Sequence, residues 1–162
     1  MMETVVIVLL AYLIGAVPSG YLIGRIFYGV DLKKTGSGNI GATNVKRVAG
    51  KKLSKITAIC DMLKAIIPVL LTRILIWTDI LQANESLSLS LVAIAAILGH
   101  NYTIFLKFKG GKGVATSAAA FMIVIPIPFL ITAVIFFGLK LVTKIVSIRS
   151  LVAGATLFLS TL

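Results

Sequence analysis

The sequence is poor in the residues that build disulfides and metal centres. Its 162 residues include one cysteine, Cys60, and one histidine, His100. One cysteine cannot form an intramolecular disulfide, and a metal centre usually needs several thiolate or imidazole ligands. We therefore expect no metal centre of this kind.

Charge is also scarce: only 13% of the residues are charged, and only five are acidic. A soluble domain usually has about a quarter of its residues charged. Here 59% of the residues are hydrophobic and the mean hydropathy is +1.08. Several apolar runs approach or exceed the roughly 20 residues that cross a bilayer. The first run has no basic segment before it, so we expect a retained helix rather than a signal peptide. These features indicate an integral membrane protein.

The apolar runs predict an all-α fold, a polytopic membrane helical bundle of about six helices in a single transmembrane domain over 1–162. Pro18 is expected to kink the first helix, and Pro126 and Pro128 to divide one long run into two short helices. The expected helices span 2–25, 55–78, 87–106, 114–125, 127–143 and 151–162.

The cations are concentrated in the polar connections 26–54, 107–113 and 144–150 and the residues beside them, which hold fourteen of the sixteen Lys and Arg residues. Three acidic residues, Glu3, Asp79 and Glu85, fall on the opposite side. The positive-inside rule then predicts an outer N-terminus and three cytoplasmic connections. This distribution explains the net charge of +11 without nucleic acid, which we do not expect as a partner.

The first glycine loop, residues 36–44, is the centre of the longest polar stretch. Its glycines allow consecutive N–H groups to point into one hollow, which suits an anion. The cations that follow, among them Arg47, favour a phosphate or carboxylate. The loop also carries four hydrogen-bonding side chains: Ser37, Asn39, Thr43 and Asn44.

The second glycine loop, residues 107–113, contains Gly110, Gly111, Lys112 and Gly113, but it lacks the spacing of a Walker A motif. His100 lies a turn or two before it and could hold a hydroxyl nucleophile or take its proton. Asp61 and Lys64 share a helix face within a predicted span. A structural ion pair and a supporting role near the site are both open for them.

The two glycine loops, with Gly99-His100 between them, resemble those of the bacterial acyl-phosphate-dependent glycerol-3-phosphate acyltransferase family, and the match extends over nearly the whole chain. The family has a seventh helix and a polar tail that this chain is expected to lack. Further matching segments are Val17–Gly24, Asp61–Lys64, Phe105–Thr116 and Lys144–Ser150.

The resemblance implies an inner-membrane enzyme, facing the cytoplasm, that uses neither a metal nor CoA nor another cofactor, and we expect it to be a monomer. It would move an acyl group from acyl phosphate to the 1-hydroxyl of glycerol 3-phosphate and give lysophosphatidic acid. Its implied catalytic residues are Ser37, Arg47, His100 and Lys112. Its implied substrate-binding residues are Gly36, Gly38, Asn39, Thr43, Asn44, Gly110, Gly111, Gly113, Ser147 and Ser150.

An anion transporter or channel is the alternative, because helices broken by proline and loops rich in cations also occur at transport sites. It is less favoured, because nearly all the cations lie at one membrane face.

Overall fold

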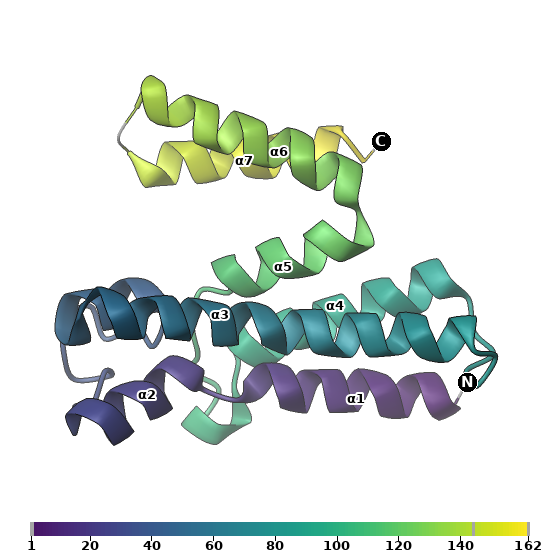
Figure 1. Ribbon diagram of the computed structural model, residues 1–162, viewed down its shortest axis with the longest axis horizontal. Coiled ribbons are helices and arrows are strands. Elements are labelled where there is room, and N and C mark those ends of the chain that lie inside the picture. The colour runs from purple at the N-terminus through teal and green to yellow at the C-terminus, as the bar shows by residue number, and fades with distance from the viewer. Residues whose placement is uncertain (1, 144, 162) are drawn as a thin grey trace. The chain divides into compact units, whose positions relative to one another are not determined.

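The computed structural model describes residues 2–143 and 145–161, and every regular element in that part of the chain is helical (Figure 1). The prediction of an all-α fold is confirmed. The chain divides into two compact units, Met1–Ala120 and Phe121–Leu162. That both belong to a single domain stays a prediction. The elements are α1 (Met2–Ala16), α2 (Ser19–Tyr28), α3 (Ala42–Trp77), α4 (Glu85–Asn101), η1 (Ile104–Leu106), α5 (Val114–Val124), α6 (Pro126–Gly138), η2 (Leu139–Leu141) and α7 (Val146–Leu159).

In the first unit, α1, α3 and α4 pack along one another (Figure 1). Glycines let α1 and α4 approach until their backbones touch. A Cβ added at Gly15 would overlap the carbonyl oxygen of Ala96, and one added at Gly99 would overlap that of Tyr12. Close packing through small residues is typical of helices in membranes, where apolar surface alone does not drive association.

The predicted kink at Pro18 is a full break, since α1 ends at Ala16 and α2 begins at Ser19. A break leaves backbone carbonyls without their helical partners. Two buried side chains from other elements supply the missing donors. The Thr103 hydroxyl donates to the carbonyl of Ala16, and the Lys64 ammonium donates to the carbonyl of Val17.

Helix α3 begins earlier than predicted, at Ala42 rather than residue 55, so the expected connection 26–54 is wrong over its second half. Gly50 interrupts the helix with φ 85° and ψ 176°. The stretch before it is helical because Val45 and Ala49 pack against Leu32, outside the helix, in a small core. Polar neighbours conceal this apolar face in the sequence.

The outer face of α3 is apolar, whereas its inner face buries charged and polar side chains among apolar ones, unlike a helix in a soluble protein. Ile59, Leu63 and Ile67 are 55%, 41% and 45% exposed, whereas Asp61 and Lys64 are buried. Two other segments, Met2–Tyr28 and Glu85–Leu106, are long and apolar enough to cross a membrane. Apolar side chains facing outward are expected where the surrounding medium is lipid.

The two short helices predicted around the prolines are confirmed as α5 and α6, which meet at Ile125. In the second unit, α6 packs against α7. The predicted connection 144–150 is wrong beyond Ile145, because α7 already begins at Val146. Arg149, which the sequence placed in that connection, is buried in α7, and its guanidinium lies over the Phe136 ring of α6, 5.2 Å from the ring centroid.

Candidate functional site

A buried polar cluster of three side chains lies inside the first unit. Asp61, Lys64 and His100 are 3%, 5% and 5% exposed. The Lys64 Nζ lies 2.9 Å from Asp61 Oδ1, 2.6 Å from the Val17 carbonyl oxygen and 3.4 Å from His100 Nδ1. An ammonium group has three hydrogens to donate, so these three acceptors saturate it.

Three separate elements bring this cluster together. Asp61 and Lys64 are three residues apart on the inner face of α3, as the sequence predicts. His100 comes from the end of α4, and the Val17 carbonyl comes from the α1–α2 break. Thr116 of α5 adds a bond from its hydroxyl to the Asp61 carbonyl, at 2.9 Å. The structure thus shows the ion pair and places Lys64 next to the predicted site histidine, while a supporting role for Lys64 at the site stays a prediction.

The second glycine loop folds back onto the end of α4. The Gly110 and Gly111 N–H groups donate to the carbonyls of Asn101 and His100, each at 3.0 Å. These bonds satisfy carbonyls that the end of a helix leaves open. The N–H groups of Gly110 and Gly111 are thus already in use, and the role of these two glycines in binding substrate stays a prediction.

Close packing also explains glycine at position 111. A Cβ there would overlap Nε2 of His100, so the imidazole lies directly against this loop. At Gly113, an added Cβ would approach Asn101 Oδ1. That oxygen is buried and has no hydrogen-bond partner among the described residues. Asn101 was not singled out from the sequence, because its burial against Gly113 becomes visible only in the structure.

Lys107, Phe108 and Lys109 at the start of the second loop are exposed, and so is Lys112 near its end. Helix α5 begins two residues later, at Val114. The first N–H groups of a helix lack helical acceptors and favour an anion nearby. The exposed ammonium and the helix start therefore provide positive charge at the same place.

The first glycine loop is braced from within by Asn44, which is buried. Its Oδ1 accepts the Ser37 N–H at 2.9 Å, and its Nδ2 donates to the carbonyls of Leu32 and Thr35 at 3.3 and 2.9 Å. Gly36 needs to be glycine here, because its φ is 65° and a Cβ would overlap the Asn44 amide. The Asn44 side chain is thus occupied in holding the loop.

The remaining predicted residues of the first loop face outward. Ser37, Gly38, Thr43 and Arg47 are exposed. Asn39 is half-buried, and its side chain accepts the N–H of a neighbouring glycine at 2.8 Å. The loop leads directly into α3, as the second loop leads into α5.

The two glycine loops belong to adjacent segments. Lys33, just before the first loop, donates from Nζ to the Leu106 carbonyl, just before the second, at 3.1 Å. Two of the three connections predicted for the cytoplasmic side are therefore neighbours in the structure. Ser147 and Ser150 lie in α7 of the second unit, and their side chains are outside the described part of the structure, so their roles stay predictions.

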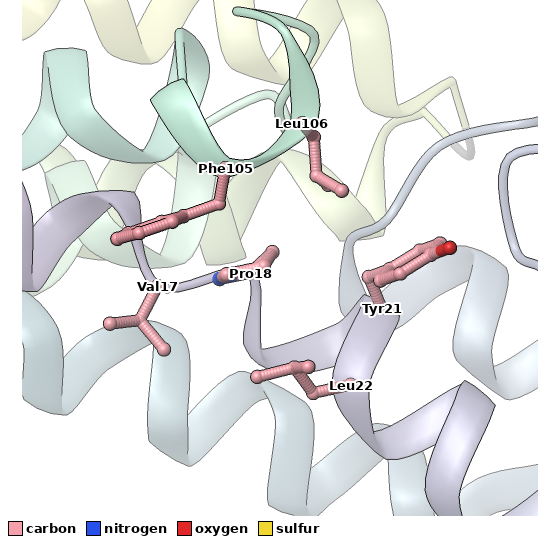
Figure 2. Close-up of a pocket in the computed structure, with 6 residues that line it drawn as sticks. All are labelled: Val17, Pro18, Tyr21, Leu22, Phe105 and Leu106. Atoms are coloured by element: carbon pink, nitrogen blue, oxygen red, sulfur yellow. The ribbon is translucent and has the colours of Figure 1, made fainter.

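An apolar pocket of about 310 Å³ lies where the α1–α2 break faces η1 (Figure 2). The backbone of its wall is tied to the polar groups already described. The carbonyl of Val17 accepts from Lys64, and that of Leu106 accepts from Lys33. The side chains that line it are those of Val17, Pro18, Tyr21, Leu22, Phe105 and Leu106.

Cationic and apolar surfaces therefore meet beside a buried histidine. Within residues 2–143 and 145–161, no group of three or more His, Cys, Asp or Glu side chains is placed to hold a metal ion. The inverted helix faces and this combination of surfaces define an integral membrane protein with a site suited to an amphiphilic anion.

Comparison with known proteins identifies the family. The family model described as glycerol-3-phosphate acyltransferase matches residues 5–162, and the chain belongs to this family. A glycerol-3-phosphate acyltransferase of Clostridium acetobutylicum is 49% identical over 157 residues, which cover 97% of this chain and 79% of that protein. A glycerol-3-phosphate acyltransferase of Macrococcus caseolyticus is 41% identical over 167 residues, which cover 99% of this chain and 79% of that protein.

Solved structures agree with this assignment. The crystal structure of PlsY (YgiH), an integral membrane glycerol 3-phosphate acyltransferase, in its glycerol 3-phosphate form matches with a TM-score of 0.82 at 36% identity, covering 97% of this chain and 75% of that one. The lysophosphatidic acid form matches with a TM-score of 0.80 at 36% identity, covering 97% and 74%. The prediction of a helical membrane fold of this family is confirmed.

Proposed function

We propose that this protein transfers a fatty acyl group from acyl phosphate to the 1-hydroxyl of glycerol 3-phosphate and releases lysophosphatidic acid and inorganic phosphate. The observation that carries the proposal is the hydrogen bond between Lys33 and Leu106, which joins the segments that lead into the two glycine loops. Each loop leads into a helix start, an exposed cation lies near each start (Arg47 in the first turns of α3, Lys112 just before α5), and Leu106 of this bond also lines an apolar pocket. Solved relatives crystallised in glycerol 3-phosphate and lysophosphatidic acid forms support the acceptor and the product.

Acyl phosphate suits a site with exposed cations. It is a mixed anhydride whose leaving group is phosphate. The acceptor hydroxyl oxygen bonds to the acyl carbon, the bond from that carbon to the phosphate oxygen breaks, and the hydroxyl proton leaves with a phosphate or to water. Negative charge builds on the carbonyl oxygen and on the departing phosphate, so fixed positive charge stabilises the transition state.

The residue roles follow from exposure and position. Arg47, with the exposed Ser37 and Thr43, binds a substrate phosphate at the start of α3, because these side chains have open access to solvent. Asn44 holds the first loop in shape. Asn39 and the glycines at 36 and 38 shape the same loop.

At the second loop, Lys112 and the start of α5 hold the acyl-phosphate group. Gly110 and Gly111 fix the loop against α4, and Gly113 sits at its turn with φ 69°. The His100 ring packs against Gly111 of this loop, where it positions the reacting groups. The apolar pocket leaves space for part of an acyl chain close to these cations.

The protein acts in the bacterial cell membrane as a monomer, with the N-terminus outside and the glycine loops facing the cytoplasm. The distribution of the cations supports this orientation. Membrane lipid surrounds the apolar helix faces, and both water-soluble glycerol 3-phosphate and the amphiphilic donor reach the loops from the cytoplasmic interface.

The experiment that tests the residue roles compares matched cation deletions in membranes or nanodiscs. Arg47→Ala and Lys112→Ala are expected to lower kcat/KM with acyl phosphate by about 10- to 150-fold or more, because a hydrogen-bonded charge on an anion contributes roughly 1.5–3 kcal/mol and more where charge develops. The controls Lys46→Ala and Lys109→Ala remove a nearby exposed cation of each loop. Equal losses in controls and test variants would contradict specific roles for the two cations.

A further inference from the structure

We infer that Lys64 is a positioning residue that holds His100 as the tautomer with its proton on Nε2, so that the ring serves the second glycine loop as a hydrogen-bond donor. The role of the Nε2–H group in the reaction rests on the proposed function, but the tautomer itself can be measured without an activity assay.

The assignment follows from counting hydrogens. Lys64 Nζ has three acceptors around it: Asp61 Oδ1 at 2.9 Å, the Val17 carbonyl at 2.6 Å and His100 Nδ1 at 3.4 Å. A lysine ammonium can only donate, so Nδ1 has to offer its lone pair. The proton of the neutral ring then sits on Nε2.

The competing arrangement puts the proton on Nδ1 and directs it at Asp61. Asp61 Oδ1 lies 3.6 Å from Nδ1, farther than Lys64 Nζ and beyond hydrogen-bond range. That arrangement would also leave one Lys64 hydrogen without its acceptor in a buried place, which is costly. Geometry and donor count therefore agree on the same tautomer.

The other end of the ring faces the loop. An added Cβ at Gly111 would overlap Nε2, and the Gly111 N–H is bonded to the His100 carbonyl, so ring and loop are held in mutual contact. An Nε2–H group at this place donates to an anion or hydroxyl held by the loop. It has no lone pair with which to accept a proton from the acceptor hydroxyl.

The tautomer can be read directly, because His100 is the only histidine in the chain. Protein labelled with ¹⁵N-histidine, in nanodiscs at a pH where the ring is neutral, gives two ring nitrogen signals. Nε2 couples to both ring carbon-bound protons, and Nδ1 strongly to one. We expect the protonated type of shift at Nε2 and the unprotonated type at Nδ1. The opposite pattern in the unaltered protein overturns the inference.

The role of Lys64 is tested by Lys64→Met, with Lys52→Met as the same change at an exposed lysine. Without the ammonium, the Asp61 carboxylate is the polar side chain closest to Nδ1, so the ring proton is expected to move to Nδ1. If an unpaired Asp61 prevents folding, the variant D61N/K64M removes both charges, and a mixture of tautomers is expected. A variant that folds and keeps only the Nε2–H form overturns the inference.

Activity separates a donor from a base. His100→Gln keeps a side-chain N–H donor but no basic nitrogen, whereas His100→Ala keeps neither. With acyl phosphate, we expect His100→Gln to exceed His100→Ala by about tenfold or more in kcat/KM, the value of a hydrogen bond to a charged group. Equal activities overturn the donor role. If His100→Ala matches the unaltered enzyme, the proposed function of His100 fails, while the tautomer measurement stands by itself.

Discussion

The contact between Gly111 and the His100 ring makes Gly111→Ala the sharpest single test of the site geometry. The φ of Gly111 is not positive, so alanine adds a methyl group without backbone strain. That methyl would overlap Nε2 of His100. The ring cannot simply turn away, because Nδ1 lies against Lys64 at 3.4 Å. Either the ring or the loop must therefore move.

Forcing an extra methyl group into a packed site costs about 1–3 kcal/mol. The Gly111 N–H is bonded to the His100 carbonyl, so the displacement is shared between the loop and the end of α4. If the whole cost falls on the geometry that binds the transition state, kcat/KM decreases by roughly 5- to 150-fold.

The assay is the initial rate of lysophosphatidic acid formation from acyl phosphate and glycerol 3-phosphate, together with the melting temperature of each variant. Gly154→Ala is the control, because an added Cβ there meets no atom within 4 Å. It is expected to keep its activity and gain slightly in helix stability. If Gly111→Ala folds and transfers acyl groups at the normal rate, the contact between loop and ring is wrong.

Three other changes test the supporting structure. Gly99→Ala is expected to destabilise the protein by at least about 1–3 kcal/mol, because its methyl would overlap the α1 backbone, and a thermal melt beside Gly154→Ala measures this. Asn44→Ala removes three bonds from the first glycine loop, and we expect the KM for glycerol 3-phosphate to rise about tenfold or more; an unchanged KM would contradict the bracing role. Thr103→Val leaves the buried Ala16 carbonyl without its donor, and should lower stability by about 1–3 kcal/mol in the same melt.

Local signals in the sequence were enough to predict where the helices break. Proline removes a backbone donor and cannot continue a regular helix, so the interruption at Pro18 and the division before Pro126 follow from the residue type alone. The predicted start of α3 was wrong because Val45 and Ala49 pack against Leu32, an apolar residue that lies outside the helix. A polar sequence does not reveal a core completed by a residue outside the helix.

In the candidate site, too, local features could be predicted from the sequence and contacts between distant residues could not. The pairing of Asp61 with Lys64 follows from helical spacing, and the two glycine loops stand out by composition. The meeting of Lys64 with His100 joins residues 36 apart, and the bond to the Val17 carbonyl joins residues 47 apart. Such contacts depend on how three helices pack, which no local pattern encodes.

The proposed reaction is tested most directly by measuring products from alternative donors with purified protein in nanodiscs. With acyl phosphate and glycerol 3-phosphate, the account predicts lysophosphatidic acid and inorganic phosphate in equal amounts, with little product from acyl-CoA. Efficient transfer from acyl-CoA would contradict the donor assignment. Phosphate flux into liposomes without transfer from any donor would contradict the enzyme assignment itself.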